Sequence, residues 1–302
     1  MKTLLDELRE GAPSPTAAVR EVPAPVRWRI LLGGRLHQFG WLFFGFGMIF
    51  FWGFVCHADL TSWYRFRAPL AIAQGTVTGS KDTGASEGGS KYHRGTPIYR
   101  NDFEFMVDDY EYRNASYAVG TELRKNHLVE VEYVAGKPQF ARIRGMRTNV
   151  FGPVVLLAIV LPLIGLGLIG LCLAQGFRAC DLLARGLSST ARLLSQEPTN
   201  TKTYGRTVYK FTFSFQTSAG ATQSLIINTE RAERFQNPAA EAVLYDPSNP
   251  KSAVILDNLP GKPHLDDAGG ISLEQPGISY LVLPLATLIG HGFWAIHLLL
   301  KS

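Results

Sequence analysis

Residues 150–173 read VFGPVVLLAIVLPLIGLGLIGLCL, a run of 24 residues without a charged side chain. The hydrocarbon core of a bilayer is about 30 Å thick and needs about 20 helical residues, so this run is long enough to cross it. Two more uncharged runs lie at residues 39–58, with 20 residues, and at residues 280–300, with 21. The sequence therefore predicts three transmembrane helices, one in each run.

The composition agrees with a membrane protein. The chain has 302 residues, of which 46% are apolar and 18% charged, and its formal net charge is +5. Ordinary globular chains carry about a quarter charged residues, and the deficit here lies in the three uncharged runs. The apolar content excludes an intrinsically disordered chain. The length excludes a single small disulfide scaffold, and the three cysteines, Cys56, Cys172 and Cys180, leave no set of pairs and no CxxC metal spacing.

Positive charges beside the first run predict its orientation, because lysine and arginine are enriched on the cytoplasmic side of membrane spans. Four arginines precede the run and two follow it: Arg20, Arg27, Arg29 and Arg35 before, Arg65 and Arg67 after. We therefore expect a cytoplasmic N-terminus. If each run crosses once, residues 59–149 are extracytoplasmic and residues 174–279 cytoplasmic. Pro153 and Pro162 also allow a re-entrant middle helix, which would put both loops on one side.

Residues 1–38 are interpreted as an N-terminal tail and proline-rich linker. Several arginines precede the first apolar run, so no secretory signal peptide is expected. The apolar spacing in Met1–Arg9 favours a short amphipathic helix. Four prolines between Gly11 and Pro25 favour an extended linker.

The two loops between the runs contain an internal repeat. Residues 131–143 match residues 243–255 without a gap, at a separation of 112 residues. The matching pairs are Val131 and Val243, Tyr133 and Tyr245, Pro138 and Pro250, Ala141 and Ala253, and Ile143 and Ile255. An upstream block matches at a separation of 110 residues: Phe103 with Phe213, and Phe105 with Phe215. We therefore predict two copies of one module, at residues 68–147 and 186–258.

Each module is predicted to be mostly antiparallel strand. Apolar residues alternate with polar ones from Phe103 to Val107 and from Tyr209 to Phe215, which is the period of a half-buried strand. Turn residues at 108–109 and 218–220 allow a hairpin in each copy. About five strands in roughly 75 residues fit a small barrel or sandwich. The predicted fold class is an α+β membrane protein with three transmembrane helices and two such extramembrane modules.

These features resemble the domain-of-unknown-function 3592 family of bacterial membrane proteins. The resemblance rests on the aromatic hairpin, on the closing valine-x-tyrosine, proline turn and apolar strand, and on the bracketing helices. It is closest in Val243–Ile255, whereas the first copy differs from the family in its turn, Val134–Pro138. The resemblance covers about residues 70–146 and 186–258. It implies a small β-domain on a membrane anchor in the bacterial inner membrane, and it supplies no reaction and no catalytic residues.

A glycine-rich stretch, Gly84–Lys91, lies in the first module. It lacks the Gly-Lys-Ser/Thr that opens a helix in phosphate-binding loops, so nucleotide binding is not expected, and a loop between strands is the simpler interpretation. The basic and aromatic end of this stretch is a candidate contact for lipid phosphate or another anionic partner: Lys91, Tyr92, His93 and Arg94.

No pattern of catalytic or metal-binding residues stands out in the sequence. The seven histidines are scattered, without Cys, Asp or Glu at ligand spacing, and neither G-x-S-x-G nor His-Glu-x-x-His occurs. We therefore expect no enzyme activity, no metal and no cofactor. A lipid-processing enzyme would require an acid, base or nucleophile clustered at one membrane interface. Asn114-Ala-Ser116 is a glycosylation sequon, but the bacterial resemblance argues against its use.

Small residues four apart in the spans let helix backbones approach closely. Two such pairs occur, Gly170 with Ala174 and Ala286 with Gly290. Trp63 and Tyr64, with neighbouring arginines, are predicted to anchor the chain at one membrane interface. Residues 177–194 are predicted to form a helix at the other interface.

The predicted function class is binding. A scaffold, an accessory subunit of a membrane assembly or an envelope sensor would act through the two modules. The expected partners are membrane lipids and other membrane proteins, or further copies of the chain, and no nucleic acid. The alternative is a transport or channel component built by oligomerisation, with His291 and His297 near the pathway.

Overall fold

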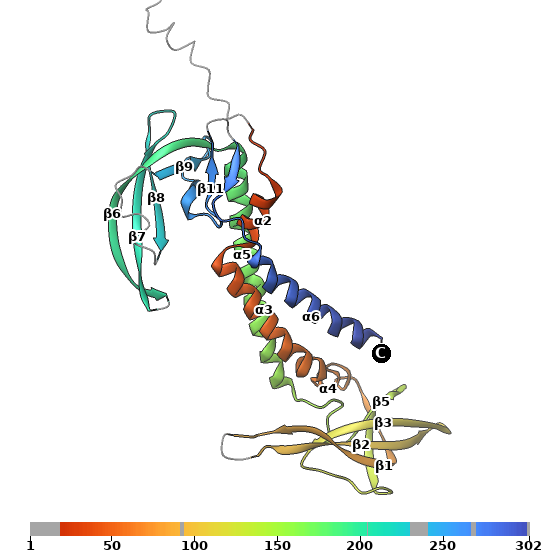
Figure 1. Ribbon diagram of the computed structural model, residues 1–302. Helices are drawn as coiled ribbons and strands as arrows, with labels where there is room; N and C mark the ends of the chain where they lie inside the picture. Colours follow the sequence, from red (N-terminus) through yellow and green to blue (C-terminus); the bar gives the residue numbers. More distant parts are fainter. Residues whose placement is uncertain (1–18, 91–93, 204, 230–240, 267–269, 301–302) are drawn as a thin grey trace, which may run out of the picture. The chain divides into compact units, whose positions relative to one another are not determined.

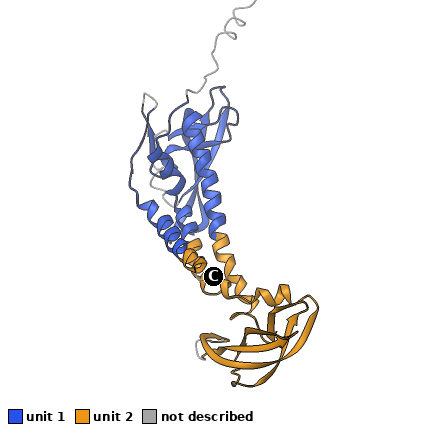
Figure 2. Cartoon of the chain, turned by 90° about the vertical axis from the view of Figure 1, so that its right-hand side faces the viewer, with its two compact units in different colours: residues 1–42, 165–293 blue, residues 43–164, 294–302 orange. Residues whose placement is uncertain are grey.

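The computed structural model describes residues 19–90, 94–203, 205–229, 241–266 and 270–300. The chain is an α+β protein with three long apolar helices and two five-stranded antiparallel sheets (Figure 1). It divides into two compact units, residues 1–42 with 165–293 and residues 43–164 with 294–302 (Figure 2). Each unit contains one of the two sheets.

The three long helices are α3 (Arg35–Gly53), α5 (Val160–Arg185) and α6 (Val282–Leu299). With their adjoining turns, they form stretches of 23, 33 and 21 residues that are long and apolar enough to cross a membrane. The prediction of three such helices is confirmed. A 3-10 turn at Pro153–Ile159 leads into α5.

The middle helix is longer than its uncharged run. α5 continues to Arg185 and the strand β6 (Leu187–Thr203) starts two residues later, so the predicted interface helix at 177–194 is wrong. The added turns contain good helix formers and bury Leu183 completely. Gly186 follows the last residue of the helix, and this position requires glycine because a Cβ atom there would lie 2.4 Å from the carbonyl oxygen of Leu182.

The segment before α3 contains a helix that overlaps the predicted extended linker, Gly11–Pro25, only at its last two residues. Pro25 fits the first turn of α2 (Ala24–Leu32), where no N–H is needed for an intrahelical bond. Val26, Ile30 and Leu31 are buried in α2, so tertiary packing stabilises this short helix. The predicted helix at Met1–Arg9 lies outside the described residues.

The first sheet has the strand order β3-β2-β1-β4-β5. Its strands are β1 (Leu70–Glu87), β2 (Thr96–Val107), β3 (Tyr110–Val119), β4 (Leu128–Val134) and β5 (Lys137–Ile143). Side chains of β3 join it to β5, the other edge strand. The N–H of Ile143 donates to Ser116 Oγ at 2.8 Å, and Asn114 Nδ2 donates to the carbonyl of Gln139 at 3.0 Å. The sheet is therefore nearly a closed five-stranded barrel.

The second sheet repeats this order as β10-β9-β6-β7-β8. Its other strands are β7 (Arg206–Gln216), β8 (Thr222–Thr229), β9 (Glu241–Tyr245) and β10 (Ala253–Ile255). Phe211, Phe213 and Phe215 lie on its buried face, as their alternation predicts. A short hairpin of β11 (Pro263–Leu265) and β12 (Ile271–Leu273) follows.

The strand registers confirm the predicted repeat. Val131 pairs with Ile143 between β4 and β5, and Val243 pairs with Ile255 between β9 and β10. The tyrosine and alanine of the repeat also lie opposite each other in both sheets. β1 and β6 each carry two register shifts against their partner strands, at equivalent places. The two sheets are therefore copies of one structural module.

The second sheet shares a hydrophobic core with two helices of its own unit. The buried cluster draws residues from α2, from the end of α5, and from the sheet and the turns after it: Val26, Ile30, Leu182, Leu183, Leu244, Leu256 and Ile271. Leu183 of α5 and Leu244 of β9 are both fully buried. The second module therefore packs directly against α2 and α5 and is not separated from them by a flexible linker.

Candidate functional site

The predicted contact for an anionic partner lies in the β1–β2 hairpin. Lys91, Tyr92 and His93 are outside the described residues, and Arg94 is exposed just before β2. The predicted glycine-rich loop is shorter than expected, because β1 extends to Glu87. Binding of an anionic partner at this hairpin stays a prediction.

The predicted small-residue pairs do not pack inside the described part of the chain. Gly170, Ala174, Ala286 and Gly290 are all exposed, and a Cβ atom added at either glycine would meet nothing within 4 Å. Their contact with another chain stays a prediction.

The close helix approach within the described chain involves two other glycines, Gly40 and Gly47. A Cβ atom at Gly40 would lie 2.9 Å from Ile169, and one at Gly47 would lie 2.4 Å from Pro162. These glycines are seven residues apart, which is nearly two helical turns and puts them on one face of α3. The seven-residue spacing of Gly40 and Gly47 in the sequence is the pattern that could have predicted this helix contact.

The buried carboxylate of Asp59 joins the segment before the first module to the segment after it. Only 5% of this residue is exposed. Its Oδ1 accepts from the N–H of Ser62 at 3.0 Å and from Thr148 Oγ1 at 2.5 Å, and its Oδ2 accepts from the N–H of Thr148 at 3.1 Å. Backbone hydrogen bonds join Asp59 and His57 to Phe151. The segments that lead into and out of the module are therefore tied to each other.

Both acids at this junction are held ionised. Burial raises the pKa of Asp59, but the hydrogen bonds from Ser62 and Thr148 outweigh it and lower the pKa below its ordinary value. Glu87, at the end of β1, is paired through two hydrogen bonds with Arg147, at 2.5 and 3.0 Å. The hydrogen bond from Arg147 lowers the pKa of Glu87.

Arg20, in the segment before α2, binds the end of α5, from which the chain enters the second module. The guanidinium of Arg20 donates from Nε to the carbonyl of Leu183 at 2.9 Å and from Nη2 to the carbonyl of Gly186. The N–H of Arg20 donates to the carbonyl of Ala184 at 2.8 Å. These bonds occupy carbonyls at the end of α5, where helices leave acceptors without intrahelical partners.

Aromatic and arginine side chains form the surface next to the first module. The short helix α4 (Leu60–Arg65) exposes Trp63 and Tyr64. The guanidinium carbon of Arg65 lies 3.7 Å from the ring centre of Phe140 in β5, a cation–π contact that joins α4 to the module. The anchoring of this surface at a membrane interface stays a prediction.

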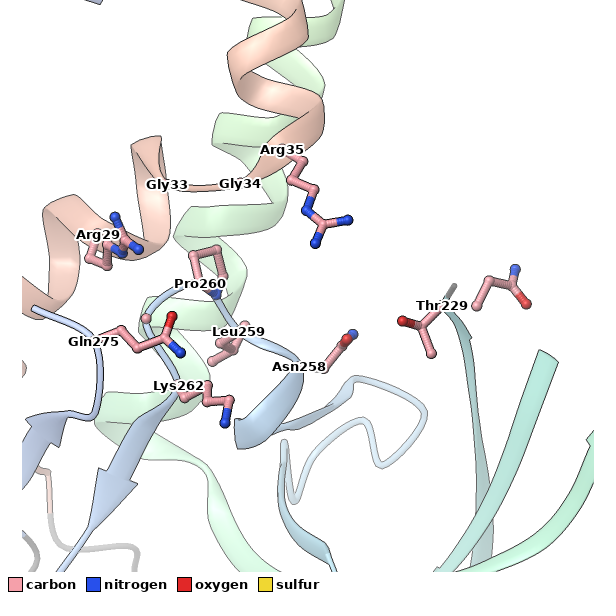
Figure 3. Close-up of a pocket in the computed structure, with 12 residues that line it drawn as sticks. Arg29, Gly33, Gly34, Arg35, Thr229, Asn258, Leu259, Pro260, Lys262 and Gln275 are labelled. Atoms are coloured by element: carbon pink, nitrogen blue, oxygen red, sulfur yellow. The ribbon is translucent and has the colours of Figure 1, made fainter. Parts of the chain in front are cut away.

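A polar cavity of about 370 Å³ lies at the break between α2 and α3. Arg29 of α2, Arg35 of α3 and Lys262 surround it (Figure 3), and no carboxylate is among the described residues that line it. Arg29 Nη1 donates to the carbonyl of Gly277 at 3.2 Å, and Lys262 Nζ lies 3.1 Å from a carboxylate oxygen of Glu274. The arrangement suits an anion.

The polar cavity was not predicted from the sequence. In the sequence, Arg29 and Arg35 are recognisable only as charges beside a predicted span. Lys262 follows Arg35 by more than 200 residues in the chain. The sequence signal was the Pro260-Gly261 pair, which is typical of a turn. Gly261 adopts φ +81°, and a Cβ atom there would lie 2.6 Å from Arg29 Cγ, so a glycine is required where the turn approaches this arginine.

Comparisons with known proteins identify no family. No protein-family model matches the sequence, and the comparison with curated proteins gives no match. Among solved structures, a chain of a replication protein A heterotrimer bound to single-stranded DNA aligns at 10% identity with a TM-score of 0.16. The alignment covers 72% of this chain and 52% of that chain, so this chain spans about half its length. A likeness at this level supports no inference about fold or function.

Proposed function

We propose that this chain is a non-enzymatic, multi-pass protein of the bacterial inner membrane that acts by binding through its two β-modules. In this role it is a scaffold, an accessory subunit of a membrane assembly, or an envelope sensor. Its N-terminus is cytoplasmic in this proposal, as the arginines before the first span favour. The bacterial location rests on the predicted resemblance to the domain-of-unknown-function 3592 family alone, because no family model matches the chain.

The observation that carries the proposal is that buried hydrogen bonds join the segments at the two ends of the first module, and that the second module packs on helix. Asp59 ties the two ends of the first module together beside its flanking helices, and the second module shares a buried core with α2 and α5. A module on a flexible linker would bind a partner without transmitting anything to the spans. A module joined by buried hydrogen bonds and packing can hold a partner in a fixed place, or pass a displacement to the helices.

The test is purification of the tagged full-length protein from its native membrane, with mass spectrometry of the proteins that accompany it at stoichiometric amounts. Asp59→Asn removes a carboxylate oxygen from the junction. Asp109→Asn is the matched control, because Asp109 is exposed in the β2–β3 turn and asparagine tolerates its φ of +64°.

We expect a defined set of membrane proteins with the wild type and the Asp109→Asn variant, and a reduced set with Asp59→Asn. Turnover of a lipid substrate by the purified protein alone would overturn the proposal. A homo-oligomer without other proteins, together with a transport defect in the cell, would favour the channel alternative instead.

A further inference from the structure

A second cavity adjoins the polar cavity in the same unit. It has a volume of about 440 Å³ and lies between the start of α3, the second half of α5 and residues 251–260. The two cavities share one wall, which consists of Gly34, Arg35, Asn258, Leu259 and Pro260. We name the second one the amphiphilic cavity, because of the residues that line it.

The lining of the amphiphilic cavity is apolar on one part and cationic on another. Its apolar part includes Ile30, Leu31, Leu36, Leu182 and Val254. Its cationic part consists of Arg35, Arg178 and Lys251, and no carboxylate is among the described residues that line it. A ligand that fills this space must therefore carry both a hydrocarbon part and an anionic part.

The cavity lies where the apolar parts of two candidate spans begin or end. Arg35 is the first residue of the candidate span Arg35–His57. Cys172, which also lines the cavity, is the last but one residue of the uncharged run 150–173, and Arg178 lies beyond that run. In an embedded chain this level is the boundary between lipid headgroups and acyl chains.

His37 lines this cavity and has a buried hydrogen-bond donor without a partner. The side chain lines the cavity and is 1% exposed. Trp41 Nε1 donates to His37 Nε2 at 2.9 Å. Because an indole N–H only donates, Nε2 is the acceptor and the proton of the neutral imidazole is on Nδ1. Nδ1 is buried and has no hydrogen-bond partner, so an acceptor oxygen of a ligand would satisfy it.

The start of α3 adds a favourable field for an anion. The first N–H groups of a helix lack intrahelical acceptors, and the helix dipole places partial positive charge there. α3 has no acidic residue in its first turn to neutralise that charge. The dipole therefore acts in the same direction as the three cationic side chains and the His37 donor.

We propose that the amphiphilic cavity binds an anionic phospholipid, with its phosphate against Arg35, Arg178 and the His37 Nδ1–H and its acyl chains along the apolar wall. The polar cavity beyond the shared wall leaves room for a polar headgroup. The inference rests on the proposed membrane embedding and is independent of any protein partner of the modules. A failure of the embedding is separately visible, as extraction of the chain without detergent.

The experiment measures lipid binding to the detergent-purified full-length protein by native mass spectrometry. The probes are dioleoyl phosphatidylglycerol, dioleoyl phosphatidylcholine and soluble glycerol 3-phosphate. Arg178→Gln removes an exposed charge from the cavity, and Arg206→Gln removes an exposed charge at the start of β7 as the matched control. His37→Phe removes the donor and keeps a flat ring, with the melting temperature as the check on folding.

We expect tighter binding of phosphatidylglycerol than of phosphatidylcholine. A charged contact near a membrane surface contributes about 1 kcal/mol, so Arg178→Gln is expected to weaken phosphatidylglycerol binding about fivefold. Arg206→Gln should leave it unchanged, and a folded His37→Phe protein should bind more weakly. Equal binding of the two lipids, or wild-type binding by Arg178→Gln, would overturn the proposal. Glycerol 3-phosphate that binds as tightly as the lipid would also overturn it, because the acyl chains would then contribute nothing.

Discussion

Thr83 in the first module and Thr199 in the second make the same hydrogen bond. Thr83 Oγ1 donates to the carbonyl of Ile98 at 2.7 Å, and Thr199 Oγ1 donates to the carbonyl of Val208 at 2.7 Å. Each hydroxyl also accepts from the N–H two residues further on, at 3.2 and 3.3 Å. Both threonines lie at a register shift of the first strand. The two modules therefore share this threonine hydrogen bond, although it lies outside the blocks in which their sequences match.

Replacing either threonine is expected to loosen its hairpin by a similar amount. Valine keeps the shape of threonine and removes the hydroxyl, which typically contributes about 1 kcal/mol when it bonds a backbone carbonyl. We expect faster deuterium uptake in residues 80–87 for Thr83→Val and in residues 196–202 for Thr199→Val, measured by mass spectrometry. Thr76→Val, in the same strand as Thr83, is the control. Unchanged uptake in both variants would show that the register shifts do not depend on these hydroxyls.

One buried polar pair distinguishes the two modules. Asn101 and Ser116 face each other between β2 and β3 and are both fully buried. At the equivalent place in the second module, Phe211 faces Ile227. Asn101 accepts from the N–H of Leu123, and Ser116 accepts from that of Ile143, so the polar pair directs the chain across the open side of the sheet. The apolar pair offers no such bonds.

Ser116→Ala is therefore expected to destabilise the first module. The N–H of Ile143 would lose its acceptor in a buried place, which costs about 1–3 kcal/mol. We expect a lower melting temperature and faster deuterium uptake in β5. Ser224→Ala is the control, since Ser224 is exposed in β8. A Ser116→Ala protein as stable as the control would mean that the barrel closes without this hydroxyl.

The features that could be predicted from the sequence depend on residues close together in the chain, whereas the features that could not depend on contacts between distant residues. The uncharged runs and the repeat that contains Val131 and Val243 can be recognised without knowledge of tertiary contacts. The helices and the repeated module that they predicted are both present. The nine-residue helix α2 is not readable in this way, because Val26 and Ile30 form a meaningful face only against the end of α5. The polar cavity joins Arg29 to Lys262, and no short window of sequence relates those two residues.

The Asp59 junction is expected to weaken in acid. Because the pKa of Asp59 is lowered in the folded chain, its carboxylate contributes stability that is fully present above the unfolded value of about 4 and is lost as the pH falls through the folded pKa. Asp59→Asn lacks this contribution at every pH. We expect the wild type to melt at a higher temperature than Asp59→Asn at pH 7, and this difference to shrink below about pH 4.

The comparison with Asp59→Asn separates this group from Glu87, whose pKa is also lowered. Glu87 is present in both proteins, so its titration cancels in the difference between their melting temperatures. A difference that stays constant from pH 7 to pH 3 would show that Asp59 stabilises the junction by shape rather than by its charge.

Labelling of matched cysteines tests whether the two modules face opposite sides of the membrane. Glu111 and Thr222 occupy equivalent, exposed positions at the starts of β3 and β8. In a background without the three native cysteines, we expect a membrane-impermeant maleimide to label Glu111→Cys in intact spheroplasts and Thr222→Cys only after permeabilisation. This outcome follows if each long helix crosses once, because the 33-residue middle stretch is too short for two crossings of about 20 residues each. Labelling of both cysteines from the same side would instead mean that the middle helix is re-entrant, with Pro153 and Pro162 at its break.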